Sequence, residues 1–216
     1  MTTLSHSHSP DETMNQLLDA WVRAVLRYDS FWSGDDCCWW YNERTNVSVL
    51  AGAAWAEGWV ALEEYSTQKG APTLPDQEKI DFGGRVDLYI SNRDVDFAFE
   101  AKLAWQPIAA GDEGGNYSKV KTKRDQADDA AKQLYKEAGT HYAATFVVPF
   151  FKPSEIQSEI ENRRSKLTEW IEMVKSEVGA DESLAYVFPR LGQNYYINDK
   201  GYAYPGVVLI LKQIPA

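Results

Sequence analysis

No part of the sequence narrows the possible folds more than the stretch from Gly84 to Trp105, GRVDLYISNRDVDFAFEAKLAW. It contains two runs rich in valine, leucine, isoleucine and phenylalanine, a composition typical of β-strands. A short segment from Asn92 to Val95 separates them, so the pair predicts an antiparallel hairpin. Charged side chains stand inside both runs, although burying an unpaired charge is unfavourable. They therefore either lie on a solvated face or serve a chemical purpose.

The charged residues of this hairpin are Asp87, Glu100 and Lys102. Because side chains alternate between the two faces of a strand, the apolar residues of both runs are expected together on one face. They are Val86, Leu88, Ile90, Phe97, Phe99, Ala101 and Leu103. The three charged residues then share the opposite face, and one register places Asp87 across from Glu100 with Cβ atoms about 5 Å apart. Facing carboxylates are tolerated where they are open to water, share a proton or bind a cation.

The third of these possibilities predicts a chemistry. Two carboxylates on neighbouring strands, Asp87 and Glu100, would form a hard-oxygen site for Mg²⁺ or Mn²⁺. Such a metal can polarise a phosphodiester and lower the pKa of a bound water. Lys102 could orient or deprotonate the attacking water, or neutralise charge that develops on the phosphate. The alternative is a solvated face on which the three residues are merely polar.

The spacing Asp87-x12-Glu100-x-Lys102 resembles the motif of the PD-(D/E)xK nuclease superfamily. Asp87 stands at the first acidic position, and Glu100-Ala101-Lys102 corresponds to the ExK element. The likeness in the order of elements covers roughly residues 47–151. One departure is Val86, where the family often has proline.

The resemblance implies a restriction-endonuclease-like, three-layer α/β fold with a central mixed β-sheet flanked by helices. It also implies a metal-dependent endonuclease or phosphodiesterase that hydrolyses DNA with metal-activated water, with Asp87 and Glu100 as ligands of Mg²⁺ or Mn²⁺ and Lys102 as a catalytic residue. The alternation of helix-like and strand-like segments independently predicts an α/β domain with a mixed sheet.

In this family the helix before the hairpin often contributes another carboxylate. A second helix is expected here over residues 47–68, and its candidates are Glu57, Glu63 and Glu64. We favour Glu64 as a catalytic residue, followed by Glu63. An exposed helical glutamate without a role in catalysis is the alternative for each.

A short basic run lies beyond the hairpin and before a helix expected at residues 125–135. Its members, Lys119, Lys121, Lys123 and Arg124, could contact phosphate groups of a nucleic acid. Gln126, on the same helix, could face the catalytic site. The alternative is a solvated segment whose charge is balanced by nearby aspartates.

The remaining segments complete the expected architecture. A tail over residues 1–9 is expected to be disordered, and residues 10–216 to form a single nuclease-like domain. A first helix is expected near residues 10–28, and a buried strand at residues 145–151. A helix after Ser154, a strand over residues 183–189 and a terminal hairpin over residues 194–214 follow. The tyrosines of that hairpin are interpreted as cross-strand pairs; base stacking is the alternative.

The net charge of −10 limits the partners of this chain. Electrostatics opposes free association of an acidic protein with nucleic acid or an anionic membrane. An inactive nuclease-like scaffold that acts as a protein-interaction or regulatory module is therefore the alternative function, and a structural domain without a site is a third. DNA is the expected partner, with a homodimer or a basic protein as further possibilities and no membrane association. The adjacent Cys37 and Cys38 are interpreted as buried thiols of a cytoplasmic protein.

Overall fold

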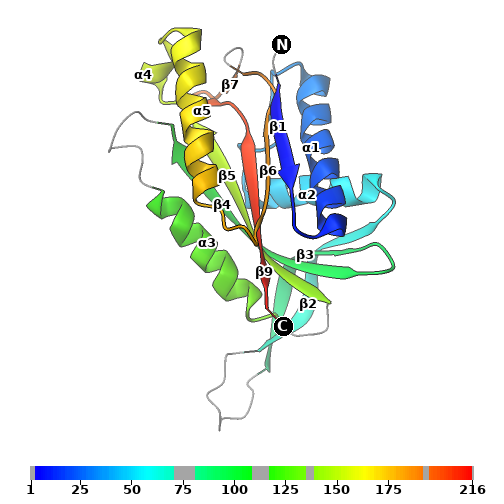
Figure 1. Cartoon of the computed structure of the whole chain (residues 1–216). Coiled ribbons are helices and arrows are strands. Elements are labelled where there is room, and N and C mark those ends of the chain that lie inside the picture. The colour runs from blue at the N-terminus through cyan, green and yellow to red at the C-terminus, as the bar shows by residue number, and fades with distance from the viewer. Residues whose placement is uncertain (1–2, 71–80, 109–116, 135–138, 192–194, 216) are drawn as a thin grey trace.

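A seven-stranded mixed sheet forms the centre of the molecule, in the order β1-β6-β9-β5-β4-β3-β2 (Figure 1). The structure is a computed structural model that describes residues 3–70, 81–108, 117–134, 139–191 and 195–215. The strands of the large sheet are β1 (Leu4–His8), β2 (Val60–Gly70), β3 (Asp81–Ser91), β4 (Asp96–Pro107), β5 (Thr140–Phe150), β6 (Ser183–Phe188) and β9 (Val207–Ile214). A separate two-stranded sheet pairs β7 (Tyr196–Ile197) with β8 (Ala203–Tyr204). The β4–β5 pair is parallel and the other pairs are antiparallel.

Helices cover both faces of the sheet. They are α1 (Glu12–Trp32), α2 (Glu43–Ala56), α3 (Ser118–Ala131), α4 (Pro153–Ile156) and α5 (Ile160–Ser176). Helices α1 and α2 pack on one face through one hydrophobic cluster, and α5 packs on the other face through a second cluster that also includes Val120 of α3. This arrangement confirms the predicted α/β class with a central mixed sheet flanked by helices.

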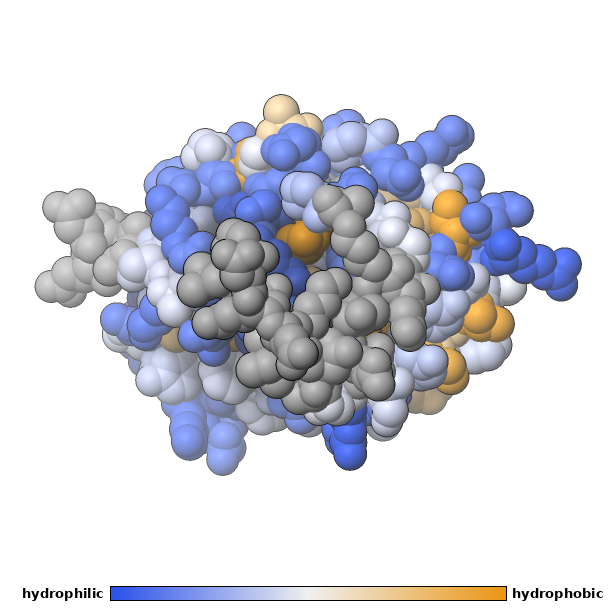
Figure 2. All heavy atoms as spheres, turned by 90° about the horizontal axis from the view of Figure 1, so that it is seen from below, coloured by the Kyte–Doolittle hydropathy of each residue, from blue (hydrophilic) through white to orange (hydrophobic). Residues whose placement is uncertain are grey.

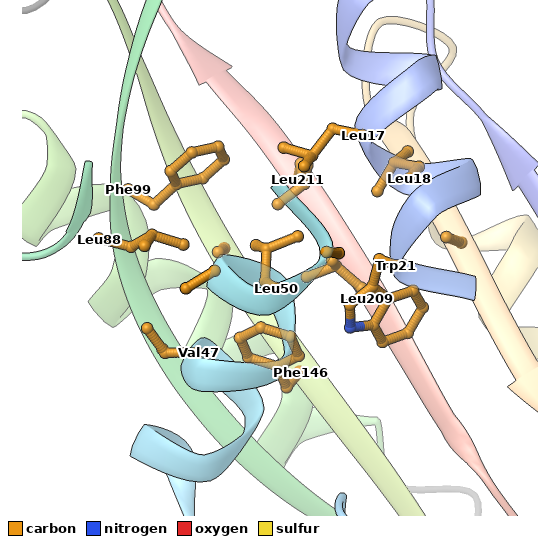
Figure 3. Close-up of a cluster of buried hydrophobic side chains, with 14 of the residues drawn as sticks. Leu17, Leu18, Trp21, Val47, Leu50, Leu88, Phe99, Phe146, Leu209 and Leu211 are labelled. Carbon is orange, nitrogen blue, oxygen red and sulfur yellow. The ribbon is translucent and has the colours of Figure 1, made fainter. Parts of the chain in front are cut away.

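The larger core joins α1 and α2 to the middle of the sheet. Figure 3 shows Leu17, Leu18 and Trp21 of α1 facing Leu209 and Leu211 of β9. Leu50 of α2 lies between this group and the side chains of β3, β4 and β5, and it is 1% exposed. This packing anchors α2, and therefore its first turn, against the hairpin strands.

The expected second helix over residues 47–68 is wrong at both ends. Helix α2 begins at Glu43, where the side chain of Asn42 accepts a hydrogen bond from Thr45 N–H (2.9 Å) and caps the helix. It ends at Ala56, because Gly58 adopts a φ of 78°, a left-handed conformation that terminates helices. The sequence from Val60 onward pairs with β3 as strand β2.

The prediction that residues 1–9 form a disordered tail is also wrong for the central part of this segment. Leu4–His8 form β1, which pairs antiparallel with β6 at the sheet edge. His6 packs against the ring of Tyr186, with ring centroids 5.4 Å apart. A polar segment gains order here because an open strand edge offers it backbone partners.

The expected first helix and the buried strands are confirmed with shifted ends. Asp11 caps α1 by accepting a hydrogen bond from Met14 N–H (2.6 Å). The apolar run expected at residues 145–151 lies in β5 up to the last residue of the strand, Phe150, and β5 is buried along most of its length. The helix expected at residues 125–135 is α3, which begins earlier and therefore includes the basic run. The strand at residues 183–189 is β6, and Tyr196 pairs with Tyr204 as a cross-strand pair.

Cys37 and Cys38 are buried and free, as expected. Burial raises the pKa of the Cys38 thiol to about 12, so this thiol stays protonated at neutral pH. Within the described ranges, no helix combines the length and apolar character needed to cross a bilayer. Figure 2 shows one end of the molecule, where hydrophilic side chains predominate among the described residues.

Candidate active site at the parting of two strands

Strands β3 and β4 pair only between the hairpin turn and Leu88, whose partner is Phe99. Beyond this pair the strands part, because β3 continues along β2 and β4 continues along β5. The next pair in the same register would be Asp87 with Glu100. The predicted alignment of the two strands is therefore correct, but their hydrogen-bonded pairing ends one position before Asp87 and Glu100.

The parting of the strands also changes which face the side chains occupy. Leu88 belongs to the core beneath α1 and α2, as predicted, but Val86 packs with Ala98 and Leu134 in another cluster. The expectation that the apolar residues of β3 all share one face is wrong at Val86. Two residues of a regular strand with this spacing would share a face, so the strand changes its orientation at Asp87.

Two carboxylates occupy the opening between the strands. Asp87 Oδ2 accepts a hydrogen bond from Ala101 N–H (2.7 Å), and Glu43 Oε2 accepts one from Leu103 N–H (2.9 Å). Both donors belong to β4 beyond the point where β3 leaves it. Because backbone N–H groups need acceptors, these carboxylates take the place of the missing strand. Asp87 thus reaches sideways to the neighbouring strand instead of standing on a free face of the sheet.

Lys102 pairs with one of the two carboxylates at the opening, that of Glu43. Its Nζ lies 3.6 Å from Glu43 Oε1 and donates a hydrogen bond to Ala101 O (2.5 Å). Glu43 is the first residue of α2, where the helix dipole favours negative charge. The side chains of Lys102 and Glu43 are 26% and 39% exposed, so solvent reaches this ion pair.

Glu43 is the site residue that the sequence reasoning missed. Glu43 precedes the helix expected over residues 47–68, so that expectation placed it outside any helix. The signal that could have found it is Asn42-Glu43-Arg44-Thr45, in which an N-cap asparagine precedes an acidic residue of the first helical turn. Glu43 is a carboxylate on the helix before the hairpin, and we add it to the candidate site.

The predicted helical glutamates do not lie on the helix. Glu63 and Glu64 belong to β2, while Glu57 follows the last residue of α2 and pairs with Arg23 (2.5 Å). Glu63 accepts a hydrogen bond from Ser48 (2.8 Å). The expected helix does not continue through these glutamates, because the chain turns at Gly58 and enters strand β2.

Glu63 and Glu64 nevertheless line a small cavity with Asp87. This cavity has a volume of about 40 Å³, and its walls consist of Glu43, Arg44, Val47, Glu63, Glu64 and Asp87. Glu64 is bound by two arginines, whose hydrogen bonds hold the pKa of its carboxyl below the usual value, Arg44 contributing most. Glu57 is not among the residues around the cavity.

Glu100 is 4% exposed and interacts with another group of the protein. It follows Phe99 on β4, directly before the residue that binds Asp87. A carboxylate at this depth is unfavourable unless it is hydrogen-bonded, paired or bound to a cation.

The donors around the opening suit a hard divalent cation. Asp87 and Glu100 are the residues that follow the last β3–β4 pair, Leu88 with Phe99, and the cavity beside Asp87 is lined by further carboxylates and by no histidine or cysteine. Across the described ranges, no three acidic, histidine or cysteine side chains are grouped closely enough to hold an ion by themselves. Mg²⁺ commonly takes one or two protein carboxylates and completes its shell with water and substrate phosphates. Asp87 lines this cavity with Glu43, Glu63 and Glu64, whereas Glu100 is not among the residues that line it.

The basic run lies on α3, where much of its charge is already paired. Arg124 donates to Glu182 (2.5 Å) and to the carbonyl of Glu177 (2.9 Å), and Lys121 pairs with Glu177 (3.0 Å). Lys123 donates to Gln126 (2.9 Å). Helix α3 packs against β4, β5 and β9, whereas Glu43 comes from α2 on the opposite face of the sheet. Arg124 is therefore a structural residue, whereas Lys119 and Lys121 are exposed.

We expect Arg124→Ala to lower the free energy of unfolding by about 2–4 kcal/mol, because it leaves the buried carboxylate of Glu182 without its cation. Glu182 is 8% exposed, so water cannot replace the arginine fully. Urea denaturation of the variant and of Lys119→Ala on the same helix measures this difference. An unchanged midpoint for Arg124→Ala would show that the pair has no structural importance.

Comparison with known proteins finds no match for this chain among family models, curated proteins or solved structures. The class of the molecule is an α/β protein with a mixed seven-stranded sheet. Its function is inferred from the residues at the parting of β3 and β4.

Proposed function

We propose that this chain is a metal-dependent nuclease that hydrolyses phosphodiester bonds, in DNA, by metal-activated water. We further propose that its sheet and helices form a restriction-endonuclease-like arrangement. The observation that supports both proposals is the parting of β3 and β4, where Asp87, Lys102 and Glu43 are joined through the backbone of β4. A plain solvated strand face would not require carboxylates to replace backbone acceptors.

Each residue has a defined role in this proposal. Asp87 and Glu100 hold Mg²⁺ or Mn²⁺, which would supply Lewis-acid polarisation of the phosphate and a water of lowered pKa. Asp87 keeps its orientation through its bond from Ala101 N–H. Lys102 orients the water or neutralises charge on the phosphate, and Glu43 positions Lys102 through their ion pair.

The test is cleavage of single- and double-stranded DNA and RNA by the purified protein with Mg²⁺ or Mn²⁺. We expect cleavage of DNA that requires the metal, and a loss of about 100-fold or more in Lys102→Met, which keeps the apolar stem but removes the charge. Lys200→Met is the matched control, because it removes an exposed lysine from the turn between β7 and β8. Equal activity in Lys102→Met and the wild type would exclude the proposed role of Lys102.

A specific observation supports the second candidate, an inactive nuclease-like scaffold that binds another protein. A largely apolar groove of about 650 Å³ lies along α1 and α2, and its walls include Phe31 and Trp32. Phe31 is 79% exposed, an unusual exposure for a phenylalanine beside a groove. Absence of cleavage, together with no metal-dependent rise in Tm, would favour this second function, because a specific metal site stabilises the folded state.

A further inference from the structure

Two arginines stand beside the opening between β3 and β4. Arg44 follows Glu43 in the first turn of α2, and Arg85 precedes Asp87 by two positions on β3. Their guanidinium groups converge on one carboxylate, that of Glu64. Arg44 Nη2 lies 2.7 Å from Glu64 Oε1, and Arg85 Nη1 lies 3.3 Å from Glu64 Oε2. Two elements far apart in sequence thus direct positive charge to one point next to Asp87.

The backbone of Glu64 is held in a conformation that a strand residue rarely adopts. Its φ is 53°, in the left-handed region that favours glycine. The pairing of β2 with β3 includes Glu63↔Leu88 and Tyr65↔Val86 but skips the position between them. That skipped position is Glu64 opposite Asp87. Strain of this kind persists only where the surroundings enforce it, and it is concentrated at functional sites.

The contacts of Glu64 differ from those of the other carboxylates at the opening. Asp87 and Glu43 bind backbone N–H groups of β4, so their removal would leave buried donors without acceptors. Within the part of the chain that the structure describes, Glu64 pairs with two exposed arginines, whose side chains are 68% and 66% exposed. Exposed ion pairs contribute little to stability and exchange readily. Glu64 is therefore the carboxylate of this group that another anion can displace.

We propose that Arg44 and Arg85 form a clamp for a backbone phosphate of the nucleic-acid substrate, and that Glu64 occupies this clamp until the phosphate displaces it. The inference rests on the proposed function and adds the residues that bind the substrate. A backbone phosphate presents two anionic non-bridging oxygens, which match the fork geometry of guanidinium groups as the Glu64 carboxylate does. The chain carries a net charge of −10, so a local pair of cations is needed to hold a polyanion at the site.

Binding of a fluorescein-labelled DNA duplex, measured by anisotropy in EDTA, tests the clamp without cleavage. We expect Arg44→Ala and Arg85→Ala each to raise Kd by about 10-fold and to reduce the slope of log K against log salt by about 1. Glu64→Gln should lower Kd several-fold, because it keeps the shape of the side chain and removes the competing anion. Arg164→Ala, which removes an exposed arginine from α5, is the matched control and should leave Kd unchanged.

Steady-state cleavage separates the clamp from the catalytic proposal. The clamp predicts a raised KM with little change in kcat for both arginine variants, whereas a loss of kcat alone would overturn it. Arginine variants that bind DNA as Arg164→Ala does, or a Glu64→Gln variant that binds no tighter than the wild type, would also overturn it. Wild-type protein that binds DNA through Arg44 and Arg85 but never cleaves it would refute the nuclease function and leave the clamp standing. Circular dichroism should show that all variants are folded, since the substituted side chains are exposed.

Discussion

Asp87→Asn is expected to lower kcat/KM for metal-dependent DNA cleavage by about 100- to 1000-fold. Asparagine keeps an oxygen that can accept the hydrogen bond from Ala101 N–H, which the aspartate accepts at 2.7 Å. The variant therefore loses the negative charge while the geometry of the opening is retained. Metal affinity depends on that charge, so the rise of Tm with Mg²⁺ or Mn²⁺ should disappear together with cleavage.

Asp94→Asn is the matched control for this experiment. Asp94 is an exposed residue of the turn between β3 and β4, so the same chemical change is made outside the opening. The control should retain both the cleavage rate and the metal-dependent rise of Tm. If Asp87→Asn retained wild-type cleavage, the carboxylate would have no part in the reaction, and the proposed metal site would be abandoned.

Phe146→Ala should lower the free energy of unfolding by about 3–5 kcal/mol, more than Arg124→Ala or Leu62→Ala. Phe146 lies on the central strand β5 and is 0% exposed. Its ring is 6.5 Å from that of Trp21, centroid to centroid, within the core shared by α1, α2 and the sheet (Figure 3). Removal of the ring leaves a cavity that close-packed neighbours fill only in part.

Urea denaturation measures this loss through the midpoint and slope of the transition. Leu62→Ala is the control, because Leu62 is 50% exposed on the edge strand β2 and should change stability by less than about 0.5 kcal/mol. Equal losses in the two variants would contradict the assignment of Phe146 to the main core. Since the same core holds α2, and α2 carries Glu43 and Arg44, the Phe146 variant should also lose whatever activity the site has at temperatures near its Tm.

The local sequence was sufficient to predict the hairpin formed by β3 and β4. Alternating apolar residues and a short turn predicted two antiparallel strands, and the register of β3 and β4 has the predicted phase. The buried run at residues 145–151 likewise predicted β5, because a strand covered on both faces is apolar throughout. Patterns of this kind depend on neighbours within a few residues, which the sequence displays directly.

The second helix shows where such patterns fail. Leu50, Ala53 and Ala54 have helical spacing, and they do lie on the buried side of α2. The predicted helix was too long at its C-terminal end, because Glu63 and Glu64 of strand β2 continue an apparently helical pattern over a few residues. Gly58 marked the true end, but a glycine inside an apparent helix can equally be a tolerated interruption.

The sequence by itself determined the α/β class, the hairpin, and the presence of Asp87, Glu100 and Lys102 on its two strands. Only the tertiary structure decided that β3 and β4 part at Asp87, that Glu43 reaches Leu103 across 60 positions of chain, and that Arg44 and Arg85 meet at Glu64. The physical reason is that side-chain bonds to an unpaired strand edge depend on how α2 packs against the sheet. That packing depends on the whole core, so it cannot be predicted from a local pattern in the sequence.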